Sequence, residues 1–259
     1  MPATVRVLLM LFTVATLTAC GTGGGTRSNP RDDSDQVRLA RIKTDLGLAY
    51  LREGRNETAL DRLHEALDLA PDFAPAHVGL GLLYARLGKD ADAEQHFRRA
   101  LRESPEDPTA LNNFGLFLCQ RQQVDEAIGM FDKAAANPLY ESPEIAWNNA
   151  GTCLFQAGRQ DDAESQLRRA LRRNPRIPPA LLQMASISYN HQDYLGARGF
   201  LQRYLEIASH TASSLWLGIR VEQALNNRDA VASYGLLLNR NYPDSEEARR
   251  FRDLRQDSR

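Results

Sequence analysis

The chain has 259 residues and a formal net charge of −1, and its charged residues, 25% of the total, carry both signs in nearly equal number. This balance argues against a nucleic-acid-binding protein, which would need a strongly basic stripe or tail. Apolar residues make up 42% of the chain, enough for a packed core over most of its length. The three cysteines are too few for a disulfide scaffold, and no two of them have the spacing of a metal site.

Residues 1–19 have the features of an export signal. Arg6 precedes an almost wholly apolar run from Val7 to Leu17, and Thr18, Ala19 and Cys20 follow. Such a run is too short to cross a bilayer as a helix, which needs about twenty residues, but it is typical of a secretory signal. The segment resembles a bacterial lipoprotein signal, whose cysteine becomes the lipidated first residue of the mature protein. The alternative is an ordinary signal that is cut nearby, with Cys20 incidental.

The lipoprotein resemblance implies a location for the protein. Two or more acyl chains anchor a protein stably to a membrane, and a lipoprotein cysteine carries three. Gly21 follows Cys20, in place of the aspartate that often retains lipoproteins in the inner membrane. We therefore expect a lipid-anchored protein on the periplasmic face of the outer membrane. Residues 20–36 are rich in glycine and lack apolar periodicity, which predicts a flexible tether with a reach of roughly 20–25 Å.

From residue 40 onward the sequence repeats itself with a period of about 34 residues. Leu46-Gly47-x-x-Tyr50 recurs as Leu80-Gly81-x-x-Tyr84, and further copies follow toward the C-terminus. The pattern resembles the tetratricopeptide repeat. It predicts a domain over residues 37–255, with repeats at about 40–73, 74–107, 108–143, 144–177, 178–212 and 213–245, the sixth marked by Trp216, Ala232, Leu236 and Pro243, and a capping helix over 246–254.

The repeat pattern also predicts the fold. Each repeat holds two stretches of about fourteen residues whose apolar side chains have helical spacing. Gly54, Gly88 and Gly158 stand at the turn between the two stretches. Small residues such as Gly47 and Gly81 should let the two helices of a pair approach closely. Because one helix pair cannot bury its own apolar face, we predict an all-α fold, a right-handed α-solenoid of six helix pairs plus the capping helix.

The sequence contains no recognisable catalytic constellation. Its five histidines are scattered over different repeats, with no His-x-x-x-His pair and no cysteine ligand set nearby. The glycine run at residues 23–25 lacks the Lys-Ser/Thr that completes a phosphate-binding loop. Acidic pairs such as Asp161-Asp162 lie at predicted helix starts, where carboxylates interact favourably with the helix dipole. We therefore expect a protein that is not an enzyme and needs no metal or cofactor.

The first helix of each repeat should line the concave face of the solenoid. Amide side chains on this face can pair with the backbone of an extended peptide, and apolar ones can hold its side chains. Repeats that bind chaperone carboxyl termini use a clamp of Lys, Arg and Asn side chains. In this chain Thr44, Leu48 and Val78 occupy most of the clamp positions, which excludes a chaperone carboxyl terminus as the partner. The predicted groove residues are Leu82, Arg86, Asn112, Leu116, Gln120, Asn148, Thr152, Phe155, Gln156, Ser186, Tyr189 and Asn190.

Cys119 and Cys153 lie one repeat apart, at nearly equivalent places on the first helices of the third and fourth repeats. In the oxidising periplasm two thiols that meet usually form a disulfide. Their Cα atoms would have to come within about 7 Å, whereas neighbouring helices pack about 8–10 Å apart, so both cysteines would have to point inward. The sequence leaves two alternatives, a disulfide across the groove or two buried free thiols.

Several stretches resemble the PilF/PilW family of type IV pilus biogenesis proteins. They are the lipoprotein signal ending at Cys20, residues 111–119 with 147–151, and residues 214–220 followed by 242–248. The resemblance implies a pilotin, an outer-membrane lipoprotein that helps the pilus secretin to reach the membrane or to assemble there as a multimer. We expect a monomer. The alternative is another periplasmic tetratricopeptide lipoprotein that scaffolds peptidoglycan or envelope-assembly enzymes.

Overall fold

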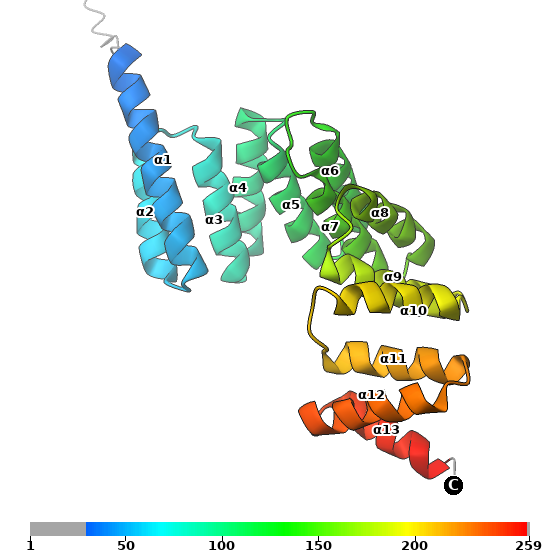
Figure 1. Cartoon of the computed structure of the whole chain (residues 1–259). Helices are drawn as coiled ribbons and strands as arrows, with labels where there is room; N and C mark the ends of the chain where they lie inside the picture. Colours follow the sequence, from blue (N-terminus) through cyan, green and yellow to red (C-terminus); the bar gives the residue numbers. More distant parts are fainter. Residues whose placement is uncertain (1–29, 258–259) are drawn as a thin grey trace, which may run out of the picture.

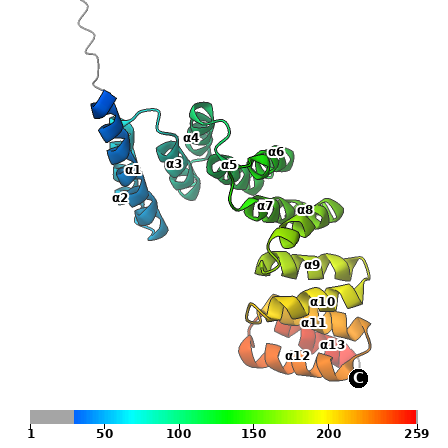
Figure 2. The same ribbon diagram turned by 45° about the horizontal axis from the view of Figure 1, so that its top comes forward.

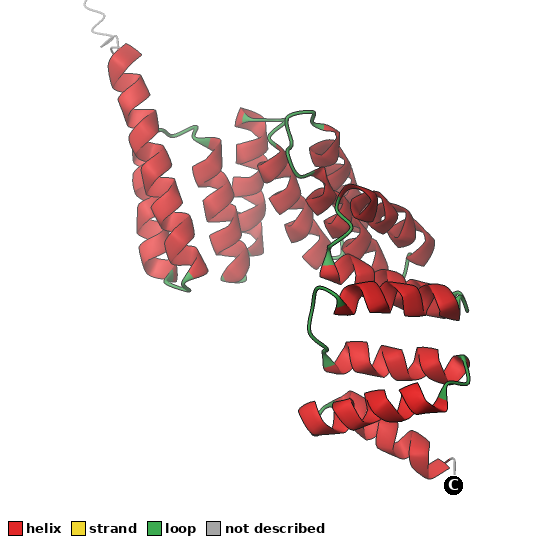
Figure 3. Ribbon diagram, viewed as in Figure 1, coloured by secondary structure: helices red, strands yellow, loops and turns green. Residues whose placement is uncertain are grey.

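The computed structural model describes the backbone of residues 30–257 and the side chains of residues 34–254. This part of the chain consists of thirteen α-helices joined by short loops and contains no strand (Figures 1 and 3), which confirms the predicted all-α fold. The predicted signal and the lipidation site Cys20 lie outside the described residues. The helices are α1 (Pro30–Arg52), α2 (Asn56–Leu69), α3 (Ala74–Arg86), α4 (Asp90–Glu103), α5 (Pro108–Gln120), α6 (Val124–Ala136), α7 (Pro143–Gln156), α8 (Gln160–Arg173), α9 (Pro178–Asn190), α10 (Tyr194–Leu205), α11 (Ala212–Ala224), α12 (Arg228–Asn241) and α13 (Glu246–Asp257).

The first twelve helices form six consecutive pairs, and each pair is closed by the same kind of turn. One residue of every turn has a positive φ, the left-handed conformation that favours glycine. Glycine marks three of the six turns in the sequence, but the others carry glutamine or asparagine, which adopt this conformation less often. The six residues are Gly54, Gly88, Gln122, Gly158, Gln192 and Asn226.

The pairs stack so that their first helices lie close together, while the backbones of their second helices lie farther apart. Each of α1, α3, α5, α7 and α9 contacts the first helix of the next pair, whereas within the described residues no Cα atom of one second helix lies within 8 Å of a Cα atom of the next second helix. A stack built in this way curves around its first helices, and the arc is visible in Figure 2. We call α3, α5, α7, α9 and α11 the inner layer, which α1 extends at the N-terminal end, and we call the six second helices the outer layer.

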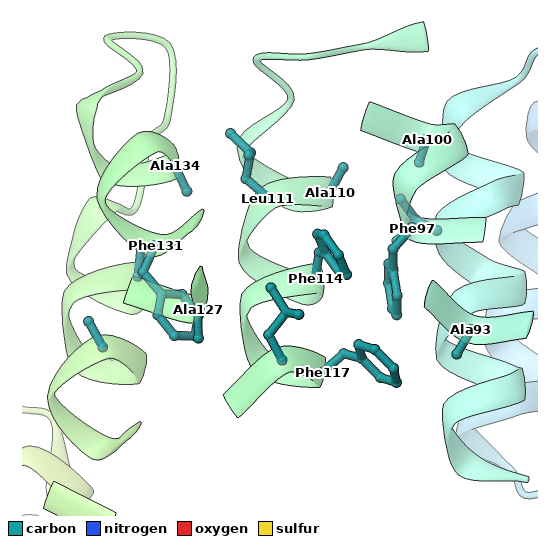
Figure 4. Packing of buried hydrophobic residues seen from close by; sticks show 14 of the residues in the cluster. Ala93, Phe97, Ala100, Ala110, Leu111, Phe114, Phe117, Ala127, Phe131 and Ala134 are labelled. Carbon is teal, nitrogen blue, oxygen red and sulfur yellow. The ribbon is translucent and has the colours of Figure 1, made fainter. Parts of the chain in front are cut away.

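A close contact between a glycine and a bulky side chain joins the two helices of a pair. A Cβ atom placed on Gly115 would lie 2.7 Å from Cε1 of Phe131, and one on Gly81 would lie 2.9 Å from Cε1 of Phe97. The expectation that small residues allow close approach is therefore confirmed. Phe97 also stacks on Phe114 of the next pair, with 5.5 Å between the ring centroids (Figure 4). Burial of each such ring contributes about 1.5–3 kcal/mol.

The sixth pair departs from its predicted helical register. Ala232 and Leu236 were expected among the repeat's packing positions, but both are exposed on α12, Leu236 with 71% of its surface accessible. This assignment is wrong, and the buried residues of α12 are Gly235 and Leu238. The ring of Phe251 from α13 lies against Gly235. The sixth pair still has its own contact of this kind, between Gly218 of α11 and Tyr234 of α12. The contact of Phe251 with Gly235 is an additional one, between α12 and the capping helix, and the repeat pattern does not contain it.

Helix α1 begins earlier than the sequence predicts. Residues 30–36, assigned to the tether, belong to this helix, and the Arg38 guanidinium lies 3.0 Å from the Asp35 carboxylate one turn away. The physical reason is local, because proline fits the first turn of a helix. Within the described residues, no helix is both long enough and apolar enough to cross a membrane.

We predict that Gly115→Ala lowers the free energy of unfolding by about 1–3 kcal/mol, because its methyl group would overlap the Phe131 ring in a packed core. Gly129→Ala in α6 is the matched control. Its methyl group would meet nothing within 4 Å, and alanine is the better helix former, so stability should rise by about 0.5–1 kcal/mol. Urea unfolding followed by circular dichroism measures both. Equal changes in the two variants would contradict the proposed contact.

Candidate functional site

The inner layer differs from the rest of the protein in its charge. Its five helices contain four charged residues, Arg86, Glu144, Arg220 and Glu222. Outer helices are rich in charge, as in α8, which opens with two aspartates and ends with two arginines. The inner layer therefore presents amide, hydroxyl and apolar groups, a chemistry suited to binding a polypeptide segment.

The structure places all twelve predicted groove residues on inner-layer helices. Arg86, Gln120, Gln156 and Asn190 are exposed and lie at the ends of four successive helices. Seven others are partly buried, and they are Leu82, Leu116, Asn148, Thr152, Phe155, Ser186 and Tyr189.

Asn112 differs from the other predicted groove residues because it is buried. Only 9% of its surface is accessible, and its Oδ1 accepts a hydrogen bond of 2.9 Å from Asn149 Nδ2 on the next inner helix. Asn112 thus joins two repeats and does not face an open groove. Its place in the repeat is the same as that of partly exposed Asn148, so position alone could not separate the two.

Polar side chains of the inner layer bridge successive repeats at other points too. Thr152 Oγ1 donates to Gln183 Oε1 at 3.2 Å, and Asn190 Nδ2 donates to Gln160 Oε1 at 3.1 Å. By contrast, Asn148 Oδ1 is buried and has no hydrogen-bond partner in the described part of the chain. A buried acceptor without a partner costs about 1–3 kcal/mol, so Asn148 can gain from a donor supplied by a bound chain.

The partly exposed apolar residues of the inner layer rest on the core. Leu82 and Leu116 pack against the buried cluster that contains Phe97 and Phe114, and Phe155 and Tyr189 pack against the next cluster. One side of each residue is therefore fixed by packing while the other faces outward. Such anchored apolar groups can receive the side chains of a partner with little loss of conformational entropy.

Cys119 of α5 and Cys153 of α7 form a disulfide in the structure. Their Sγ atoms are 2.16 Å apart and their Cα atoms 5.8 Å apart. Both cysteines belong to the inner layer, so the bond links the third and fourth repeats in the middle of the predicted groove. Of the two alternatives left by the sequence, the structure has the bonded one.

We predict that Cys119→Ser combined with Cys153→Ser lowers the free energy of unfolding by about 2–4 kcal/mol, because the disulfide restricts the unfolded chain. The measurement is urea unfolding with and without dithiothreitol. The reductant should destabilise the wild-type protein by the same amount and leave the double variant unchanged. If the free energy of unfolding of the wild-type protein is the same with and without dithiothreitol, the disulfide is contradicted.

Two histidines that are far apart in the repeat pattern meet between α3 and α4. Nδ1 of His77 lies 3.0 Å from Nδ1 of His96, and His77 Nε2 lies 3.1 Å from the Pro71 carbonyl oxygen. Burial lowers the pKa of His96 to about 4, and repulsion from His77 and His64 acts in the same direction. The His77 pKa is also lowered, chiefly by burial. The repeat pattern could not predict this pair because neither histidine occupies a repeated position.

We predict that the protein loses stability as the pH falls from about 6.5 toward 4. The unfolded chain binds a proton at an ordinary histidine pKa of about 6.5, whereas folded His96 resists protonation, so acid favours the unfolded state. Thermal unfolding at several pH values should show a shallower decline for His96→Gln than for the wild type. Gln95→Ala, at the neighbouring exposed position of α4, is the control and should keep the wild-type slope. Identical slopes for all three proteins would exclude a role for His96.

No cluster of three or more His, Cys, Asp or Glu side chains that could hold a metal ion occurs in the described part of the chain. A hollow of about 880 Å³ lies away from most of the predicted groove, between α12, α13 and the turn before α12, where Leu236 and Phe251 line it. The repeat pattern does not predict this hollow, because it predicts neither the register of α12 nor the packing of α13.

Comparison with known proteins identifies the repeats and the family. The tetratricopeptide-repeat profile matches residues 44–108, 114–176 and 156–211. The chain is 32% identical over 249 residues to type IV pilus assembly protein PilF of Pseudomonas aeruginosa. The aligned region covers 96% of this chain and 98% of that protein. The solved structure of Pseudomonas aeruginosa PilF has a TM-score of 0.79 at 30% identity, covering 85% of this chain and 99% of that one. PilW, described as a widely conserved type IV pilus biogenesis factor, has a TM-score of 0.73 at 32% identity, covering 82% and 97%.

The stacked helix pairs and the matched repeats define a tetratricopeptide-repeat protein whose inner layer is the candidate binding surface. Similarity over nearly the whole chain, in sequence and in structure, narrows this class. The chain belongs to the PilF/PilW family of type IV pilus biogenesis proteins.

Proposed function

We propose that this protein is an outer-membrane lipoprotein scaffold that acts as a pilotin, promoting the localisation or multimer assembly of the type IV pilus secretin. Family membership supports a role in pilus biogenesis. The observation that carries the mode of action is the inner layer, where four charged residues occur on five helices. A segment of the secretin lies along this surface, paired with its amides and held by its apolar side chains.

The anchor in this proposal is Cys20. The sequence around it resembles a lipoprotein signal, and Gly21 in the next position favours the outer membrane. Several acyl chains on one cysteine hold the protein stably at the membrane. The helix pairs then hold the secretin segment near the lipid surface, in the periplasm, without catalysing a reaction.

A strain that lacks the gene should lose secretin multimers and twitching motility, and the wild-type gene should restore both. Complementation with Gln120→Glu plus Gln156→Glu should restore few multimers, because two charges then enter an almost uncharged surface. Gln95→Glu plus Gln202→Glu is the matched control, since these exposed glutamines belong to α4 and α10 of the outer layer. It should restore multimers fully. Multimer amount is measured by gel electrophoresis and immunoblotting of membranes, after circular dichroism shows that both variants fold.

Equal complementation by the two double variants would contradict the inner layer as the binding surface. Normal pili with altered cell shape or lysis in the deletion strain would contradict the pilotin role and favour a scaffold for cell-wall enzymes. Membrane fractionation of Cys20→Ala tests the anchor separately. The variant should leave the outer membrane while its helix pairs stay folded, and normal pilus assembly by it would contradict a need for the lipid.

A further inference from the structure

Three of the four charged side chains of the inner layer have partners within the protein. Arg86 donates to the Leu51 carbonyl oxygen. Glu144 lies 3.9 Å from the Arg173 guanidinium. Glu222, on α11, accepts hydrogen bonds from Arg198 at 2.8 and 2.5 Å and from Asn227 at 2.9 Å. These groups are already neutralised or bonded, so none of them calls for a charged ligand.

Arg220 is the exception. It makes no hydrogen bond or ion pair with the described part of the chain, and its Nε is buried with no acceptor. A buried donor without an acceptor costs about 1–3 kcal/mol, and more when the group is charged. A ligand that supplies an acceptor would remove this cost.

Two aromatic rings hold the Arg220 guanidinium in place. Its Cζ lies 4.7 Å from the ring centroid of Tyr189 on α9 and 5.9 Å from that of Trp216 on α11. Contacts with ring faces hold a guanidinium by cation–π attraction and stacking, and they leave the donors along its edge free for a planar anion. The cation is therefore already oriented at the junction of the fifth and sixth repeats.

The charges around Arg220 favour an anion. Helix α9 contains no acidic residue, and the acid of α11, Glu222, is occupied by Arg198. Arginine binds carboxylates through two parallel hydrogen bonds, which are stronger than bonds between neutral groups. Arginine, tryptophan and tyrosine are also the residue types that dominate binding energy at protein interfaces.

We propose that Arg220, clamped by Tyr189 and Trp216, is a carboxylate-binding site that fixes one end of the polypeptide held by the inner layer. This inference rests on the proposed function, because it takes the occupant to be a protein segment. The carboxylate belongs either to an Asp or Glu side chain or to a free C-terminus. Both have the same chemistry, and the test separates them.

The probes are three five-residue peptides, added to the full chain and followed by NMR at the Arg220 Nε–H and Trp216 indole N–H signals. The first is acetyl-Ala-Ala-Glu-Ala-Ala-amide, the second replaces Glu with Gln, and the third is acetyl-pentaalanine with a free C-terminus. Saturable shifts with the first peptide but not the second assign a side-chain carboxylate. Saturable shifts with the third assign a terminal one. If neither carboxylate peptide shifts the two signals, the site is overturned. It is also overturned if the Gln peptide shifts them as much as the Glu peptide does.

Variants test whether Arg220 itself carries the binding. Arg220→Gln should weaken the binding of the carboxylate peptide at least about tenfold, and Arg220→Lys should weaken it less, because lysine keeps the charge but not the planar pair of donors. Both are followed through the Trp216 signal, and thermal unfolding checks that they fold. Arg172→Gln removes the same charge from an exposed position of α8 and should leave the affinity unchanged. Equal loss in the Arg172 variant would reduce the effect to net charge and overturn the proposal.

Failure of this site and failure of the proposed function give different results. If Arg220→Gln captures secretin from membranes as well as the wild type does, the carboxylate site is wrong while the pilotin role stands. If the peptides bind at Arg220 but the wild-type chain captures no secretin, the site stands and the partner is wrong.

Discussion

The close approach of the two helices in a pair is the contact on which the rest of the structure depends. Five pairs have a glycine on the first helix directly against a bulky side chain of the second, with Leu63, Phe97, Phe131, Leu167 and Tyr234 in that role. Because the glycine has no Cβ, the bulky group reaches the backbone and brings the helices together. The outer helices, whose backbones lie farther apart, then diverge around first helices that pack against one another, and the stack curves. The concave surface is thus a consequence of packing within each pair.

The two layers also differ in their content of charged residues. The outer helices face solvent. Ion pairs such as Arg98 with Glu126 and Arg159 with Asp125 connect neighbouring helix pairs on this side. Exposed pairs of this kind contribute about 0–1 kcal/mol each, so their main effect is to keep the outer surface hydrated. The inner layer has few charged residues, which lowers the desolvation cost of binding a polypeptide along it. The same low charge makes Arg220 stand out as a recognition group.

Sequence periodicity was sufficient to predict the helix pairs, the capping helix and the layer formed by the first helices, because each depends on residues that recur at fixed spacing. Details that depend on a single contact were not accessible. Phe251 of the capping helix packs on Gly235 of α12, and no repeat pattern contains that contact. Asn112 occupies a groove position but is bonded to Asn149. The clamp around Arg220 joins side chains from two repeats, and only the packed structure brings them together.

The central claim is that the inner layer, and not the outer one, holds a partner polypeptide. Site-specific photocrosslinking in living cells tests it most directly, with a benzophenone amino acid at Gln156 of α7 or at Ser165 of α8, both exposed. We expect a crosslink to the secretin from position 156 and none from position 165. Crosslinks from position 165 alone, or equal crosslinks from both, would contradict it.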